Sequence, residues 1–225
     1  MKTNLSRREV IAAGLASMGA LSASETVGAF EDHADVGITP RAGAAQFDEA
    51  AKEYRVTGGG ANIWGAADAF QYVWKRVSGD ITFTADIRFL GSGAAGHRKA
   101  ALMIRQSLDP DAAYADAVVH GDGLTSLQFR PSAGAATQEI RSARKGPVRV
   151  RIERHGDRFE MFAGDPGQQL EPTGPATVVL EDPVYVGIAV CSHDADVLET
   201  AVFSSVSLET KPRIARAPGE GTHNN

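Results

Sequence analysis

The sequence predicts an all-β protein, an antiparallel two-sheet sandwich or jelly roll, and three observations support this. Apolar and polar residues alternate in many short runs, most plainly in residues 81–89, where every odd position is apolar. Turn residues separate the runs, as at residues 78–80 (Ser-Gly-Asp) and 165–167 (Asp-Pro-Gly). No amphipathic helical stretch lies between them, which argues against parallel strands joined by crossover helices.

The N-terminal residues resemble a twin-arginine export signal. Lys2, Arg7 and Arg8 supply positive charge, with both arginines in the Ser-Arg-Arg-Glu-Val-Ile stretch at residues 6–11. Residues 10–23 are apolar and small, and too few to span a bilayer comfortably. We therefore expect a periplasmic or secreted protein. The alternative is a basic, apolar N-terminal helix that the protein retains.

The cleavage position is open between two places. Val27 and Ala29 are small enough to suit cleavage before Phe30, which would make residues 1–29 the signal peptide. Sites near Ser22 or Ala23 are the alternatives.

The mature chain is long enough for one sandwich domain with a substantial core, expected over residues 30–208. After residue 208 the alternation ends and Pro, Gly and charge accumulate, so residues 209–225 are expected to form a flexible tail. Cys191 is the only cysteine, which rules out an intramolecular disulfide and leaves burial to stabilise the fold.

Ten runs within the domain are predicted to be strands. Further turn signals lie at residues 121–123 and 155–157, and residues 44–52 are expected to form a helical turn. The predicted strands are residues 54–57, 70–75, 81–89, 100–106, 114–120, 124–130, 148–153, 158–163, 184–191 and 201–208.

Composition limits the partners. The chain has 23 Lys and Arg against 28 Asp and Glu, a formal net charge of −5. A nucleic-acid binder normally carries a concentrated basic stripe, so no nucleic-acid partner is expected. No segment after the signal is long and apolar enough to span a membrane. The oligomeric state is not predictable.

Strand alternation also sorts side chains between core and outside. Phe70, Tyr72 and Trp74 share one face and Gln71 takes the other. Planar amides, guanidinium groups and aromatic rings on an outer face suit sugar hydroxyls and rings, although any sandwich has a solvated polar surface. The side chains expected to point outward are Lys99, Met103, Arg105, Tyr114, Asp116, His120, Ser126, Gln128, Arg130, Tyr185, Cys191 and His193.

Gly58, Gly59 and Gly60 precede a large aromatic residue, Trp64. The segment lacks the Lys-Ser/Thr ending of a phosphate-binding loop, so the glycines are interpreted as a sharp bend. Trp64 and Asp68 could contact a ligand there, and packing of the tryptophan is the alternative.

Three His- and Asp-containing segments could hold a metal: residues 120–122, 155–157 and 193–196. None has zinc spacing, and two lie at predicted hairpin turns, so turn roles are favoured. We expect no cofactor and no metal, with a structural calcium ion left open.

Signals for catalysis are weak. The chain lacks the Glu-x-Asp-x-x-Glu strand motif of laminarinase-type enzymes and the Gly-x-Ser-x-Gly nucleophile motif, and Cys191 has no marked base beside it. Asp116 and His120, on one strand face, could form an acid/base pair, and so could other carboxylates that the fold places nearby.

Residues 62–80, 99–105 and 120–130 together resemble, in order and spacing, a bacterial "regulation of enolase"-like family of unknown function in the concanavalin A-like lectin/glucanase superfamily. The resemblance covers residues 30–208 and implies a two-sheet jelly roll whose concave face often binds saccharides in that superfamily. Gln71 departs from it, since many relatives are expected to have histidine there. The matching positions are Trp64, Asp68, Gln71, Arg105, His120, Gln128 and Arg130.

The leading hypothesis is an exported, non-catalytic carbohydrate-binding domain that binds its saccharide on a polar concave face. The alternatives are a glycoside hydrolase or lyase using Asp116, His120 or a nearby carboxylate, and an envelope interaction or scaffold domain. The expected ligand-binding residues are Trp64, Asp68, Gln71, Lys99, Arg105, His120, Gln128, Arg130 and His193.

Overall fold

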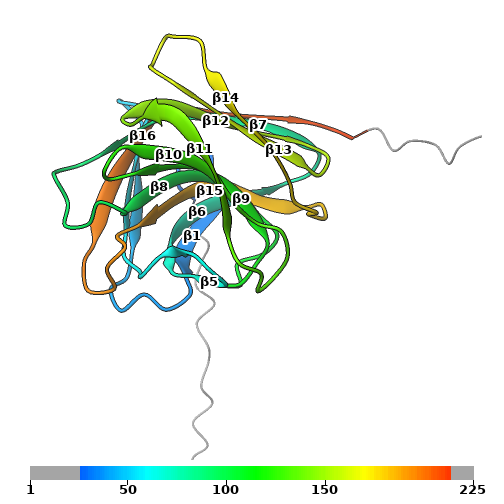
Figure 1. Ribbon diagram of the computed structural model, residues 1–225. Helices are drawn as coiled ribbons and strands as arrows, with labels where there is room; N and C mark the ends of the chain where they lie inside the picture. The colour runs from blue at the N-terminus through cyan, green and yellow to red at the C-terminus, as the bar shows by residue number, and fades with distance from the viewer. Residues whose placement is uncertain (1–25, 214–225) are drawn as a thin grey trace, which may run out of the picture.

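The computed structural model describes residues 26–213, which form two stacked antiparallel sheets of seven strands each and one short two-stranded hairpin (Figure 1). The predicted all-β sandwich is therefore confirmed. Within residues 26–213 there is no helix that could cross a membrane. Residues 1–25 of the predicted signal and residues 214–225 of the predicted tail lie outside the described residues.

The first sheet carries most of the predicted ligand-binding residues. Its strands, in spatial order, are β1 (Asp32–Val36), β6 (Phe70–Val77), β15 (Val184–Cys191), β8 (Lys99–Arg105), β9 (Tyr114–His120), β10 (Leu124–Arg130) and β11 (Gln138–Lys145). The second sheet covers one face of the first. Its strands, in spatial order, are β14 (Glu171–Thr177), β13 (Arg158–Gly164), β12 (Val148–His155), β7 (Asp80–Phe89), β16 (Glu199–Lys211), β3 (Glu53–Gly58) and β2 (Ala44–Asp48).

The main core lies between the sheets, where alternate side chains of each sheet meet. Leu102 and Ala117 of the first sheet belong to the same buried cluster as Phe83, Ile152 and Phe203 of the second, and all five are fully buried. This interlocking of two inner faces is the usual core of a β-sandwich.

All ten predicted runs are strands. The strands that the sequence did not reveal include the four edge strands, β1, β2, β11 and β14. Their residues are more polar or, in β14, include two prolines. Edge strands tolerate proline because one side of the strand needs no hydrogen-bonding partner.

The helical turn expected at residues 44–52 is wrong for residues 44–48, which form a strand, while residues 49–52 form a turn. Residues 44–48 pair with β3 in antiparallel register, and Phe47 packs on Tyr54 with ring centroids 4.5 Å apart. Pairing with a neighbouring strand outweighs the local alanine-rich sequence.

The predicted start of the tail at residue 209 is also wrong. Strand β16 continues to Lys211, since Glu209, Thr210 and Lys211 pair with Thr82, Ile81 and Asp80. The long β7 strand provides backbone hydrogen-bonding partners for residues 209–211, and the local sequence of these residues does not predict that pairing.

The residues just before Phe30 are packed against the domain. Val27 and Phe30 are buried in the main core, and the Ala29 N–H donates to the Tyr54 hydroxyl over 3.0 Å. Gly28 has a φ of 58°, and a Cβ there would lie 2.5 Å from the Tyr54 hydroxyl. Cleavage before Phe30 would remove Val27 from the core, whereas the alternatives near Ser22 or Ala23 would not.

A second buried cluster lies on the other face of the first sheet and includes Phe70, Tyr72, Trp74, Met103 and Tyr114. Strand alternation grouped Phe70, Tyr72 and Trp74 on one face without deciding which, and it correctly directed Met103 and Tyr114 away from the main core. Their expected exposure is wrong, because the hairpin of β4 (Ile63–Trp64) and β5 (Ala67–Asp68) and neighbouring loops lie over this face (Figure 1).

Candidate functional site

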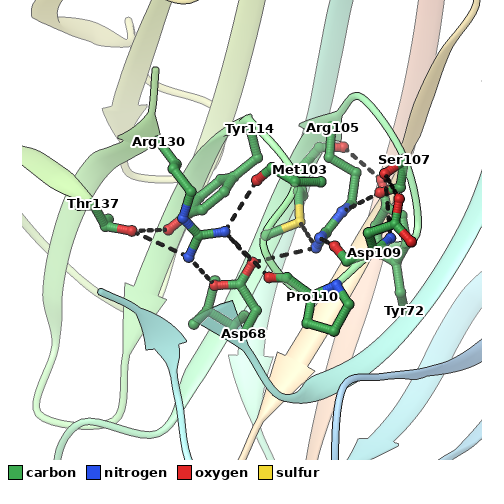
Figure 2. A network of polar contacts seen from close by, with 12 residues as sticks. Asp68, Tyr72, Met103, Arg105, Ser107, Asp109, Pro110, Tyr114, Arg130 and Thr137 are labelled. Carbon is green, nitrogen blue, oxygen red and sulfur yellow. Dashed lines mark hydrogen bonds and ion pairs between the residues drawn. The ribbon is translucent and has the colours of Figure 1, made fainter. Parts of the chain in front are cut away.

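Three of the predicted ligand-binding residues form a buried ion network (Figure 2). Arg130 Nη1 and Nη2 donate to the two carboxylate oxygens of Asp68 over 2.8 and 2.6 Å. Arg105 Nη1 lies 3.6 Å from Asp68 Oδ2, and all three side chains are fully buried. Their predicted place in an open hollow is therefore wrong, since they bind one another.

The two arginines are also held by backbone carbonyls. Arg105 Nε donates to the Ser107 carbonyl over 2.6 Å, and Arg130 Nη1 donates to the Ala112 carbonyl over 3.0 Å. Burial raises the pKa of Asp68 above its ordinary value, whereas the hydrogen bond from Arg130 and the charge of Arg105 oppose that rise. Contact with two guanidinium groups favours the ionised carboxylate.

This network fixes the β4–β5 hairpin over the sheet. The Gly65 carbonyl accepts hydrogen bonds from Arg130 Nε at 3.2 Å and from the Thr137 N–H and hydroxyl, each at 3.0 Å. At the other end Lys99 Nζ donates to the Ile63 carbonyl over 2.7 Å, and Ile63 is fully buried. Trp64, between these anchors, is consequently held in place.

Beside the hairpin lies a cavity of about 200 Å³. Lys99 of β8, His120 of β9 and Gln128 of β10 form its floor, and each is at most 4 % exposed. Trp64, which is 40 % exposed, lines the same cavity. The complete lining is Asn62, Trp64, His97, Lys99, His120, Leu124, Gln128, Glu139, Arg141 and His193.

A chain of hydrogen bonds orients the floor. Lys99 Nζ donates to Gln128 Oε1 over 3.1 Å, which points the Gln128 amide nitrogen toward Glu139 Oε1 at 3.1 Å and His120 Nε2 at 3.3 Å. His120 Nε2 is therefore the acceptor, and the ring proton lies on Nδ1. Glu139 also accepts from Ser126 Oγ at 2.9 Å and from Arg141 Nε at 2.7 Å.

The two members of the predicted acid/base pair, Asp116 and His120, differ in whether they can reach the cavity. Burial and the nearby Lys99 charge lower the pKa of His120 to about 4, so the imidazole is neutral at pH 7. Burial raises the pKa of Asp116 to about 8. Asp116 is fully buried and does not line the cavity, so only His120 could contact a molecule bound there.

Gln71 does not lie near the cavity. It points to the face that packs against the second sheet, where a Cβ on Gly58 of β3 would lie 3.0 Å from the Gln71 Cβ. Its Nε2 lies 2.9 Å from His33 Nδ1. The prediction that Gln71 shares one binding face with the others is wrong, because position 71 has the opposite parity to 70, 72 and 74.

The structure thus brings together Trp64, Lys99, His120, Gln128 and His193 from the predicted set. It adds five lining residues that sequence reasoning missed. Glu139 and Arg141 alternate on edge strand β11, which was not recognised as a strand, and the others lie in loops or at a strand start. The added residues are Asn62, His97, Leu124, Glu139 and Arg141.

Three imidazoles lie near one another, with ring centroids of His97 5.7 Å from His120 and 5.6 Å from His193. Among residues 26–213, however, no group of three or more His, Cys, Asp or Glu side chains is arranged to hold a metal ion. The structural calcium ion stays a prediction.

Several solved structures share this architecture. A functionally unknown protein from Saccharomyces cerevisiae aligns with a TM-score of 0.57 at 15% identity, covering 75% of this chain and 92% of that one. The carbohydrate-binding module CBM66 from Bacillus subtilis aligns with a TM-score of 0.50 at 20% identity, covering 79% and 95%. A Lotus tetragonolobus seed lectin aligns with a TM-score of 0.51 at 7% identity, covering 74% and 90%.

The chain has the jelly-roll sandwich fold of lectins and carbohydrate-binding modules. A GH43 protein from Bacillus licheniformis also aligns, with a TM-score of 0.57 at 11% identity, over 75% of this chain but 35% of that one. A comparison with protein-family models gives no match, and neither does one with curated proteins. At these identities the likeness shows the fold alone.

Proposed function

We propose that this protein is an exported, non-catalytic carbohydrate-binding domain whose ligand enters the cavity beside Trp64. The exposure of Trp64 carries the proposal. Three large apolar side chains among the described residues are exposed, Ile38, Trp64 and Val179, and Trp64 is the one that lines the cavity. An indole beside amide, imidazole and ammonium groups suits a sugar ring and its hydroxyls.

The cavity size indicates a short ligand. Its volume of about 200 Å³ is below the roughly 300–1,000 Å³ typical of sites for drug-sized molecules. A single sugar unit, or the end of a longer chain that continues into solvent past Trp64, fits this space better than an internal stretch of a polymer. The fold shared with a lectin and a carbohydrate-binding module agrees with this proposal.

The lining favours binding over glycoside hydrolysis. Hydrolysis by the usual mechanism needs two carboxyl groups on either side of the scissile bond. Glu139 is the only carboxylate among the residues that line the cavity, and both of its oxygens accept hydrogen bonds. The presence of a cavity also favours ligand binding over a scaffold role on this face.

A glycan array followed by titration calorimetry tests the proposal. We expect binding to at least one glycan, and Trp64→Ala to weaken it by about tenfold or more because stacking is lost. Ile38→Ala, which truncates an exposed side chain outside the cavity, should bind like the wild type. Silence on every glycan, unchanged affinity in Trp64→Ala, or release of products from a polysaccharide would contradict the proposal.

Export is tested separately. Replacing both Arg7 and Arg8 by Lys should leave the uncleaved precursor in the cytoplasm, because the arginine pair is the feature that a twin-arginine system reads. Fractionation of cells expressing either form checks this. Equal appearance of both forms outside the cytoplasm would contradict twin-arginine export.

A further inference from the structure

Lys99 is a buried cation that forms no ion pair within residues 26–213. It is 2 % exposed at the cavity floor. It donates to the Ile63 carbonyl and to Gln128 Oε1, both uncharged acceptors. Among residues 26–213, no carboxylate forms an ion pair with Lys99. Lysine is almost never buried this deeply unless it is paired, because removing its charge from water is unfavourable.

The carboxyl groups whose charge acts on Lys99 do so through space and form no ion pair with it. Both oxygens of Asp116 are buried without a side-chain hydrogen bond; burial raises the pKa of this group, and the charge of Lys99 opposes that rise without an ion pair between the two. Asp68 is already paired with two arginines, and Glu139 with Arg141. Burial also lowers the pKa of Lys99, and an anion arriving in the cavity would oppose that effect.

The cavity therefore has unused donors and a surplus of positive charge. Lys99 has three N–H groups, of which two are engaged, and Arg141 uses its Nε toward Glu139 while it is exposed to solvent at the rim. His97 and His193 line the same space. A ligand group with several acceptor oxygens and a negative charge is the chemical complement of this set.

One feature of the lining suits a hydroxyl group. Asn62 Oδ1 is a buried acceptor without a partner among the described residues, and Asn62 lines the cavity. A carboxylate alone has no proton to donate to it, whereas a sugar hydroxyl does. Trp64, 5.2 Å from Lys99 Nζ by its ring centroid, adds a flat apolar surface next to the cation.

We infer that the ligand is an acidic saccharide, a uronic-acid unit whose carboxylate pairs with Lys99 while its ring lies against Trp64. This inference rests on the proposed function and narrows it to sugars that carry a carboxylate. The carboxylate supplies the ion-pair partner that Lys99 does not find in the part of the chain that the structure describes.

Matched sugars test the inference. Oligomers of galacturonate, glucuronate and mannuronate are titrated calorimetrically in parallel with their carboxyl-reduced counterparts, the oligomers of galactose, glucose and mannose. At least one acidic oligomer should bind about tenfold or more tightly than its neutral counterpart, as expected for a charge-assisted hydrogen bond. Acetate and sulfate are titrated as simple anions.

A matched pair of variants tests the role of Lys99. Lys99→Met keeps the length of the side chain and removes its charge, so the preference for the acidic member of the pair should fall to about equal affinity. Lys211→Met removes one exposed charge from β16 of the second sheet and should retain the preference. Melting temperatures of both variants check that they fold, as expected because replacing a buried charge by an apolar residue is usually tolerated.

The outcomes separate the two claims. Equal binding of acidic and neutral oligomers would overturn the acidic specificity and leave carbohydrate binding intact. Binding of neither kind would overturn the acidic specificity, and silence on the glycan array as well would overturn the proposed function. Acetate or sulfate binding as tightly as the uronates would show a simple anion site, and a preference that survives in Lys99→Met would remove Lys99 from the recognition.

Discussion

Two buried cationic arrangements on one sheet face differ in how their charge is balanced. Arg130 and Arg105 share the Asp68 carboxylate, whereas Lys99 has neutral acceptors only. A charge that is balanced within the protein contributes to the fold, and one that is not balanced is available to a ligand. Cationic side chains on the same face of one sheet therefore have different roles.

The first prediction concerns Asp68. Asp68→Asn leaves two buried guanidinium groups without a counter-charge, and we expect the free energy of unfolding to fall by roughly 3 kcal/mol. Urea denaturation measures the change. Glu171→Gln, which removes one member of the exposed Arg144–Glu171 pair, is the control and should change stability by at most about 0.5 kcal/mol. Equal effects of the two substitutions would contradict a structural role for the network.

The second prediction concerns the pH dependence that His120 contributes. Its pKa is about 4 in the folded protein and about 6.5 in an unfolded chain, so the unfolded state takes up the proton first as the pH falls. The stability contributed by the neutral ring is present above pH 6.5 and is lost on descending to pH 4. The stability advantage of wild type over His120→Gln should therefore shrink by roughly 2 to 3 kcal/mol between pH 7 and pH 4.

Denaturation at several pH values measures this difference. Asp116, with a pKa of about 8, acts in the opposite direction in the same interval, but its contribution cancels between the two proteins. Thr125→Val removes a hydrogen bond to the Arg144 carbonyl without a titrating group and should give a difference that does not vary with pH. A constant difference for His120→Gln would show that the imidazole is not held neutral.

At the scale of elements, the β4–β5 hairpin determines what the first sheet exposes. It is only four paired residues, Ile63, Trp64, Ala67 and Asp68, yet it closes one part of the sheet face and leaves the cavity open at Trp64. Contacts from Lys99, Arg130 and Thr137 hold it at both ends. The element is stabilised by tertiary contacts, since a hairpin this short is not stable alone.

The third prediction tests the hairpin turn. Gly65 has a φ of 65°, and a Cβ there would meet no atom within 4 Å, so substitutions act through the backbone. Gly65→Ala should destabilise the protein by roughly 1 kcal/mol and weaken glycan binding by displacing Trp64. Gly65→Asn should do less, because asparagine tolerates this conformation. Thermal melts and calorimetry check both, and a stronger effect for Asn would contradict the argument.

At the scale of the whole molecule, the sandwich includes residues on both sides of the expected domain limits. Val27 and Phe30 pack into the main core at one end, and β16 extends to Lys211 at the other. The sheets also join segments far apart in the chain, since β1 pairs with β6 and β15 lies between β6 and β8. The domain therefore depends on both ends of the described chain.

The fourth prediction concerns processing. Because Val27 is 6 % exposed within the core, we expect the exported protein to retain it and to begin at or before Val27. Mass spectrometry of the exported protein gives the new N-terminus. A chain expressed from Thr26 should be more stable than one expressed from Phe30 by roughly 1.5 kcal/mol or more, the effect of burying a valine side chain. An exported chain starting at Phe30, with unchanged stability, would contradict this expectation.

The sequence predicted the residue types of much of the site and their outward direction, but not the contacts that these residues make. Alternation directed Lys99, Arg105, His120, Gln128 and Arg130 outward on their own strands, because it is a local property of a strand, but it could not show that these strands share one face. Whether such a side chain meets solvent, a ligand or an ion partner depends on contacts between distant segments. Asp68 and Arg130 are 62 residues apart in the chain, and no local pattern links them.

The sequence by itself determined the all-β class, the ten principal strands and, within most of these strands, which site side chains point away from the core, since period two and turn residues act over a few positions. Only the tertiary structure decided the order of the strands, the cover provided by β4 and β5, and the separation of Asp68, Arg105 and Arg130 from the cavity. Those features depend on which distant groups pack and pair, because burial and charge balance are set by neighbours in space.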